Sequence, residues 1–245
     1  MEEPATAAPG QPAAESARAA LNGLTRHLGI VETILRNRYP FFVEIREGSA
    51  LQDKTRSMLV TSVIFLAVYG AVLGSTHSVL QALSSAVKLP LLFLATAVIA
   101  SPTLYFFNIL YGSNQGLRQN ITLVMTAITV TSVILLAFAP ISLFFLLTTS
   151  GYQFFKLLNV AFFSIAGVIG VGFLGQGMRL AGARRRVVAL WVLMYAFVGS
   201  QMAWTLRPFI GAPSMRFEMF RQLGGNFYAN VLASLGEILG FFMVS

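Results

Sequence analysis

The sequence predicts an all-α integral membrane protein, a polytopic bundle of transmembrane helices, and two observations support this prediction. The first is composition: 56% of the 245 residues are hydrophobic and 11% are charged, whereas an ordinary soluble domain has about 25% charged residues. The second is the placement of the acids, because no Asp or Glu occurs between Arg56 and Arg216. So long a stretch without a carboxylate is typical of a chain embedded in lipid.

Composition divides the chain into three regions. Residues 1–15 are rich in Ala and Pro and are expected to form a disordered tail, because they hold nothing large enough to offset the cost of ordering. Residues 16–57 are expected to hold a cytoplasmic amphipathic helix followed by a juxtamembrane segment. Residues 58–245 are expected to form the transmembrane helical domain.

An apolar stripe with alternating spacings of three and four residues predicts the amphipathic helix. The stripe consists of Leu21, Leu24, Leu28, Val31 and Leu35. Because arginines flank it, the helix suits an anionic membrane surface, pairing with another helix, or packing on the protein's own membrane domain. Pro40 is expected to end the helix, and Phe41 and Phe42 are expected to anchor at the membrane interface.

Five runs without charge follow, each longer than the ~20 residues that cross about 30 Å of hydrocarbon. The expected spans lie near 58–76, 90–111, 121–142, 157–178 and 187–206. The third run extends beyond its span, so Pro140 is expected to mark the outer end of that span or a kink.

The last apolar segment decides the number of spans. Residues 226–245 are just long enough to cross a bilayer, and we predict that they form a sixth span. The alternative is five spans followed by a re-entrant or interfacial C-terminal helix, because Glu237 lies inside this segment. Before it, residues 214–223 are expected to form a short helix at the outer interface.

Positive charge predicts the orientation. Most Lys and Arg residues fall on the side of the N-terminus if the spans alternate, which predicts a cytoplasmic N-terminus by the positive-inside rule. The strongest markers of this topology are Arg184, Arg185 and Arg186.

Glu237 is the one acid with a claim to an intramembrane position. In a spanning helix it would lie near the midplane of the bilayer, where ionisable groups are costly and often functional. Tyr195 and Gln201 on the fifth span are the expected partners by depth. The site would bind a proton or a cation, or else Glu237 would be a neutral, hydrogen-bonded acid or an interfacial residue.

A stripe of small residues marks the fourth expected span. Ala166, Gly170 and Gly177 share one face of the helix at 100° per residue, which lets a neighbouring helix approach closely. The partner is expected to be another helix of the same chain, or a second copy in a homodimer.

The sequence contains no recognisable set of catalytic or metal-binding residues. His27 and His77 are separated by the expected topology and the chain has no Cys, so neither a metal set nor a catalytic triad is predicted. No enzymatic activity and no cofactor are therefore expected. Because the basic residues cap apolar segments rather than forming one stripe, binding of nucleic acid is not expected either.

A polar segment at 40–57, PFFVEIREGSALQDKTRS, is followed by YGAVLG at 69–74 and by several closely connected spans. This layout resembles the Yip family of multispan membrane proteins and its bacterial relatives. TLRPFIGAP at 205–213 resembles uncharacterised bacterial membrane proteins. The resemblance implies a scaffold or trafficking-type protein without enzymatic activity, here in a bacterial inner membrane.

We therefore expect a non-enzymatic membrane scaffold or interaction protein. Its expected partners are the lipid bilayer and either further copies of the chain or other subunits of a membrane complex. The alternative is a small ion- or proton-coupled transporter or channel that uses Glu237.

Overall fold

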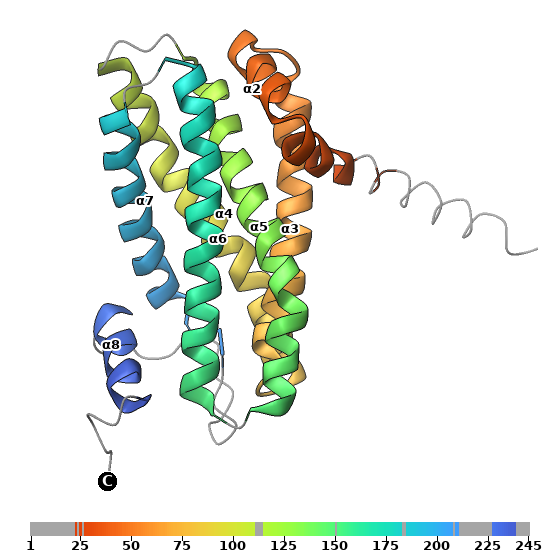
Figure 1. Cartoon of the computed structure of the whole chain (residues 1–245), viewed down its shortest axis with the longest axis vertical. Coiled ribbons are helices and arrows are strands. Elements are labelled where there is room, and N and C mark those ends of the chain that lie inside the picture. The colour runs from red at the N-terminus through yellow and green to blue at the C-terminus, as the bar shows by residue number, and fades with distance from the viewer. Residues whose placement is uncertain are drawn as a thin grey trace, which may run out of the picture.

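The computed structural model is helical throughout its main elements (Figure 1). It describes residues 23, 25, 27–110, 115–149, 151–182, 185–207, 209–210 and 227–238. The expected tail at 1–15, the stripe residues Leu21 and Leu24, and the expected outer helix at 214–223 lie outside the described residues.

Five helices in the described part of the chain are long and apolar enough to cross a membrane. They are α3 (Leu51–Gly74), α4 (Val79–Leu110), α5 (Leu117–Thr148), α6 (Tyr152–Leu180) and α7 (Arg185–Thr205). The all-helical class of fold and the five predicted apolar helices are therefore confirmed, although most of the helices are longer than the predicted spans.

Two predicted boundaries differ from the structure because a single residue was given too much weight. The second span is predicted to begin near residue 90, but α4 begins at Val79 and passes through Lys88, whose side chain is 5% exposed. Of the two roles expected of Pro140, an end to the helix is wrong, because α5 continues to Thr148, and a kink stays a prediction. Proline is tolerated in such helices where neighbouring groups satisfy the freed backbone carbonyl.

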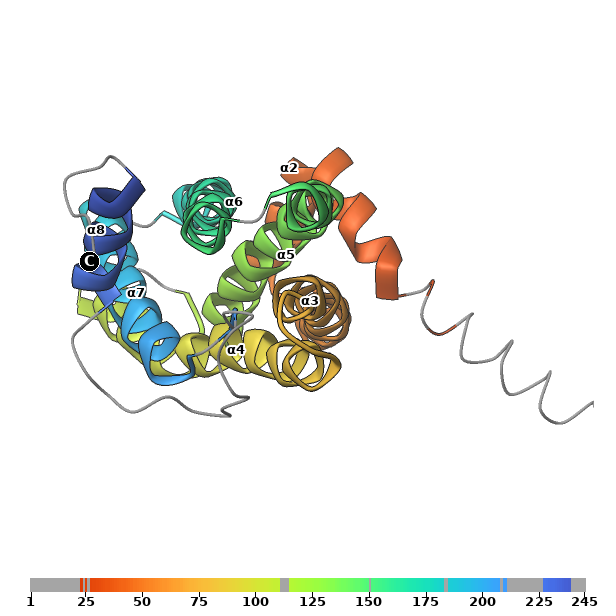
Figure 2. The ribbon, with the colours of Figure 1, turned by 90° about the horizontal axis from the view of Figure 1, so that it is seen from below.

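The described part of α8 (Phe227–Ile238) has 12 residues, which at 1.5 Å per residue is about 18 Å. That length does not cross about 30 Å of hydrocarbon. A count of six spans is therefore approximate: five helices have the required length, and α8 is a shorter apolar helix beside α6 and α7 (Figure 2).

The five long helices alternate in direction along the bundle (Figure 1). We call the end that holds α2 (Arg38–Glu47) and the starts of α3, α5 and α7 the basic end, and the opposite end the far end. α3 and α5 run in the same direction and pack together, with α4 against α3 and α6 against α5. α7 packs mainly on α4, so α3, α4 and α5 form the centre of the bundle.

The N-terminal amphipathic segment packs on this bundle by a different face from the predicted one. Residues 27–36 are helical, and Ile34 is 1% exposed whereas Leu35 of the predicted stripe is 46% exposed. Leu28 and Val31 are half-buried at the edge of the contact. The buried face is therefore centred near Ile34, which points about 100° away from Leu35 around the helix axis.

The segment after Pro40 also differs from the prediction. The first helix ends at residue 36, and Pro40 lies in the first turn of α2, where its missing N–H is tolerated. Phe41 and Phe42 belong to the buried core, at 1% and 2% exposure, rather than to the membrane interface. Aromatic residues beside a charged segment are typical of the membrane interface. The sequence does not reveal that the bundle buries these two rings.

Candidate functional site

The three residues of the predicted intramembrane polar site are not brought together by any contact among the described side chains. Glu237 lies in the last turn of α8, and its side chain is outside the described residues. Tyr195 packs against the ring of Trp191 on its own helix, with centroids 5.1 Å apart. Gln201 is half-buried on α7. A site built from Glu237, Tyr195 and Gln201 therefore stays a prediction.

α8 does meet α7, but at another point. The hydroxyl groups of Ser200 and Tyr228 are 2.9 Å apart, and the Lys156 ammonium on α6 donates to Asn230 Oδ1 at 3.1 Å. Tyr228 precedes Glu237 by nine positions, which is about 13 Å along a helix. Side-chain hydrogen bonds therefore fix the first turn of α8 to the bundle.

The stripe of Ala166, Gly170 and Gly177 lies against α5 and α2. A Cβ atom at Gly170 would collide with the Thr131 hydroxyl and lie 2.7 Å from the Ala127 carbonyl oxygen. The Thr131 hydroxyl donates to the carbonyl of Ala166 at 3.3 Å, across the two helices. The small residues thus allow backbone and side chain to approach closely within one chain.

Gly177 extends the same stripe to the basic end. A Cβ atom there would lie 2.5 Å from Leu123 Cδ2 and 2.8 Å from Phe42 Cε1. The missing side chain therefore makes room for two neighbours at once, one on α5 and one on α2.

A second pair of close-packing glycines was not recognised from the sequence. A Cβ atom at Gly70 would lie 2.9 Å from the carbonyl carbon of Ser85, and one at Gly74 would lie 2.6 Å from Ala82 Cα. The two glycines are four residues apart in YGAVLG, the spacing of the G-x-x-x-G motif that brings helix backbones together. The motif was visible and would have predicted the tight pairing of α3 with α4.

Polar side chains join α3 to α5 along their whole contact. Thr55 and Thr122 hydroxyl oxygens are 2.9 Å apart, and one period of seven residues later those of Ser62 and Thr129 are 3.0 Å apart. A spacing of seven keeps a residue on the same face of both helices. We call these two pairs the polar seam. Hydrogen bonds of this kind hold helices together in an apolar environment.

A buried polar cluster continues the seam towards the far end. The Tyr69 hydroxyl donates to Asn159 Oδ1 at 2.7 Å, and the Ser142 hydroxyl donates to the same oxygen at 3.0 Å. The amide of Asn159 donates in turn to the Phe155 carbonyl at 2.8 Å. Tyr69 and Ser142 are fully buried and Asn159 is 2% exposed, so the cluster links α3, α5 and α6 by direct hydrogen bonds between buried groups.

A tryptophan on α7 bonds to the backbone of α4. The Trp191 indole N–H donates to the Ala100 carbonyl at 2.8 Å, and the side chain is 2% exposed. Ala100 lies two residues before Pro102, within α4. A carbonyl oxygen can accept a second hydrogen bond, so the indole is satisfied without disrupting the helix.

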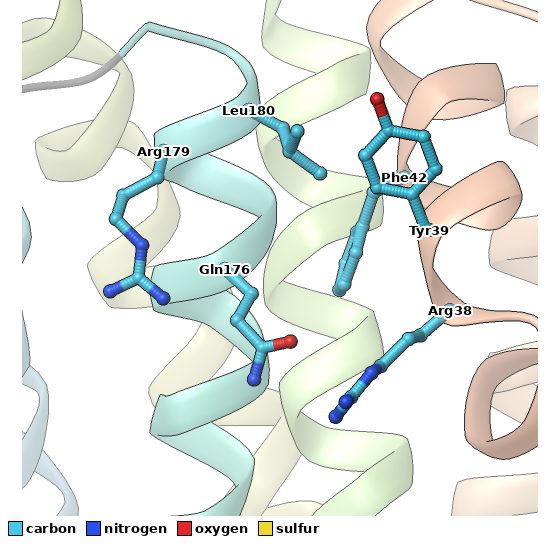
Figure 3. A pocket seen from close by; sticks show the side chains of 6 residues that line it. All are labelled: Arg38, Tyr39, Phe42, Gln176, Arg179 and Leu180. Carbon is cyan, nitrogen blue, oxygen red and sulfur yellow. The ribbon is translucent and has the colours of Figure 1, made fainter.

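A pocket opens at the basic end between α2 and α6 (Figure 3). Its volume is about 340 Å³, and it is lined by Arg38, Tyr39, Phe42, Gln176, Arg179 and Leu180. Three of these residues come from α2 and three from the last turns of α6. Figure 3 shows the Gln176 amide between the two arginine side chains, with Leu180 and the aromatic rings of Tyr39 and Phe42 above it in the view.

The pocket carries positive charge. Arg38 and Arg179 are exposed, and the ion pairs found among the described residues join other groups, Arg36 to Glu32 and Lys54 to Glu44, each at 2.6 Å. Of the predicted topology markers, Arg186 is exposed at this same end, whereas the side chains of Arg184 and Arg185 lie outside the described residues.

The two histidines lie at opposite ends of the bundle. His27 Nδ1 is 3.0 Å from the Ser57 hydroxyl near the basic end, and its carbonyl accepts from Thr61 at 3.1 Å. His77 lies in the turn between α3 and α4. The described residues hold no group of three His, Asp or Glu side chains suited to a metal ion.

Comparisons of the chain with protein-family models, with curated proteins and with solved structures find no match. The residues themselves offer two features with chemical content. One is the closed polar interior formed by the seam and the Tyr69 cluster, and the other is the cationic pocket between α2 and α6.

Proposed function

We propose that this chain is a non-enzymatic integral membrane scaffold or interaction protein that works within a membrane complex. The observation that supports it is a folded platform at the basic end, formed by residues 27–47. Ile34 and Ile45 anchor the platform in the core at 1% exposure each. A hydrogen bond between α5 and α2 adds to this, because the Gln119 side-chain amide donates to the Arg46 carbonyl at 2.7 Å. A platform fixed to the bundle presents its outer surface with little loss of conformational entropy on binding.

The polar interior favours this role over transport. Thr126 and Thr129 donate to the carbonyls four residues earlier, each at 2.8 Å, and Thr131 does so at 2.9 Å. Such hydroxyl groups satisfy themselves against the helix backbone. Their remaining contacts hold helices together, which is a structural use of polar groups rather than the lining of an aqueous path.

The membrane arrangement is part of the same proposal. We infer that α3 to α7 cross a bacterial inner membrane and that the basic end faces the cytoplasm, because positively charged residues are retained on that side. The likeness of residues 40–57 and 69–74 to the Yip family favours the same role, and membership in that family is itself part of the proposal.

Copurification of the full-length protein tests the proposal. In a mild detergent, we expect identified subunits to copurify at a constant ratio, either other proteins or a second copy of the chain. Leu35→Asp changes an apolar side chain on the platform that is 46% exposed, and should release them. Leu117→Asp is the matched control, since Leu117 is 44% exposed at the same end but lies on α5. A monodisperse monomer in both variants and in the wild type would contradict the proposal.

A flux assay tests the alternative function, a transporter that uses Glu237. We expect no proton- or cation-driven flux in proteoliposomes of the wild type. Because Gln keeps the size and much of the hydrogen bonding of a neutral Glu, Glu237→Gln should leave expression and folding intact. Flux that the wild type supports and Glu237→Gln abolishes would replace the scaffold with a transporter.

A further inference from the structure

We infer that the pocket between α2 and α6 binds the phosphate group of an anionic phospholipid. The inference goes beyond the scaffold role, and it uses only the placement of α6 across the bilayer from the proposed function. It rests on three features of the pocket: two cations that pair with no acid in the described part of the chain, an apolar wall beside them, and a position at the depth of lipid headgroups.

The first feature of the pocket is its pair of cations. Arg38 and Arg179 reach the pocket from different helices, and neither forms an ion pair with a described acid. A guanidinium group presents several N–H donors in a planar fork that matches phosphate oxygens. The Gln176 amide between them adds a neutral donor (Figure 3). Donor groups from three side chains therefore line one pocket, which suits an anion with several acceptor oxygens.

The wall of the pocket is apolar. The Phe42 side chain is 2% exposed and is seated in the gap left by Gly177. Because so little of Phe42 is exposed, the apolar surface open to a ligand comes mainly from Leu180, which is half-buried, and from the Tyr39 ring, which is 65% exposed at the rim. A free inorganic ion gains nothing from such a wall, whereas the glycerol and first methylene groups of a lipid bury apolar surface against it.

The depth of the pocket agrees with a lipid. α6 has 29 residues, or about 44 Å at 1.5 Å per residue, which exceeds the ~30 Å of hydrocarbon. Its last turns therefore extend into the headgroup layer, and Gln176, Arg179 and Leu180 lie in those turns. A zwitterionic headgroup brings its own ammonium group, so two arginines favour a headgroup with net negative charge.

Lipid binding to the purified full-length protein tests the inference. In a neutral detergent, the affinity for phosphatidylglycerol is measured by native mass spectrometry and by the rise in Tm. We expect binding about tenfold weaker in Arg38→Gln and in Arg179→Gln, which is the loss of one charge-assisted hydrogen bond. Arg38→Lys keeps the charge but not the fork, so it should fall between. Phosphatidylcholine should bind more weakly than phosphatidylglycerol to the wild type.

The control is Arg118→Gln, because Arg118 is exposed at the same end but does not line the pocket. We expect its affinity for phosphatidylglycerol to equal that of the wild type. Equal weakening in Arg118→Gln would mean diffuse attraction by surface charge and would overturn the site. Unchanged binding in both pocket variants would overturn it as well.

A measurement with inorganic phosphate distinguishes a lipid headgroup from free phosphate as the source of the bound phosphate group. If phosphate alone raises the Tm as much as phosphatidylglycerol at equal concentration, the pocket binds free phosphate and the lipid assignment is wrong. Gln176→Leu is a second variant that keeps both cations, and it should weaken lipid binding without changing the Tm of the lipid-free protein. Copurification of subunits is a separate measurement, so failure of the scaffold proposal leaves this result intact.

Discussion

Gly170 and Gly172 are two residues apart on α6 and have opposite surroundings. A Cβ atom at Gly170 meets Thr131 and the Ala127 carbonyl, whereas one at Gly172 has nothing within 4 Å. We expect Gly170→Leu to lower the free energy of unfolding by about 2 kcal/mol or more, the cost of overpacking a tight contact. Gly172→Leu should leave it unchanged. The measurement is thermal unfolding in detergent, and equal Tm values for the two variants would contradict the packing role of the stripe.

The contribution of the Tyr69 hydroxyl group to stability can be tested in the same way. Tyr69→Phe removes the donor to Asn159 Oδ1 and leaves the Ser142 hydroxyl as its remaining side-chain donor. We expect a loss of about 1 kcal/mol in stability, the usual net contribution of one such bond.

Tyr105→Phe is the matched control, because Tyr105 is a half-buried tyrosine of α4 that is not part of the cluster. We expect Tyr105→Phe to unfold at the temperature of the wild type. If both substitutions shift the Tm equally, the hydroxyl of Tyr69 has no special role.

The packing role of some residues can be predicted from the sequence, whereas that of others cannot. The spacing of Ala166, Gly170 and Gly177 indicated a packing face because small residues on one side of a helix are a local pattern. The partners of Tyr69 are not local: Asn159 is 90 positions away. No period in the sequence relates the two, so the cluster could not be predicted without the arrangement of α3 and α6.

At the scale of the element, the attachment of α7 depends on Trp191. Trp191→Phe keeps the aromatic ring in the core but removes the N–H that the Ala100 carbonyl accepts. We expect a loss of about 1 kcal/mol or slightly more, and faster proteolysis of α7 than of α3. Trp204→Phe is the control, since Trp204 is half-buried near the end of α7, under the Arg207 guanidinium. Equal protection of α7 in the two variants would contradict the role of the indole N–H.

The existence of the long helices was predictable, whereas their ends were less so. Runs without charge located all five, because a bilayer requires long apolar segments. Lys88 misplaced the start of α4, since a cation can be buried inside a long helix where polar groups satisfy it, and Lys88 is 5% exposed. α2 was not predicted at all, because its ten residues carry charge at both ends and only the fold provides the groove for Phe41 and Phe42.

For the whole molecule, the proposed topology predicts which ends are reached from outside the cell. The chain has no native Cys, so single cysteines report cleanly. Ser75→Cys is in the exposed turn at the far end and should react with an impermeant maleimide in intact cells. Arg118→Cys and Arg186→Cys, at the basic end, should react only after permeabilisation. The reverse pattern would invert the topology, and labelling of all three in intact cells would contradict an alternating bundle.

The pairing of the helices is the part of the fold that the sequence did not provide. Consecutive helices pack as neighbours, as expected for short connections, but α3 also packs along α5, with α4 between them in the chain. The signal was present as Thr55 and Ser62 at a spacing of seven, matched by Thr122 and Thr129. Such residues also occur where a hydroxyl group bonds only to its own helix, so the spacing alone does not identify the pairing.

The polar seam has a consequence for how the protein is made. α3 and α4 leave the ribosome first, and their glycine contact at Gly70 and Gly74 can form at once. The hydroxyl groups of Ser62 and Tyr69 find their partners only after α5 and α6 have been synthesised. At one residue every 50 to 200 ms, the newborn hairpin waits for several seconds with these groups facing lipid or the insertion machinery. A chain truncated after α4 would keep them unpaired, and cellular quality control would be expected to remove it.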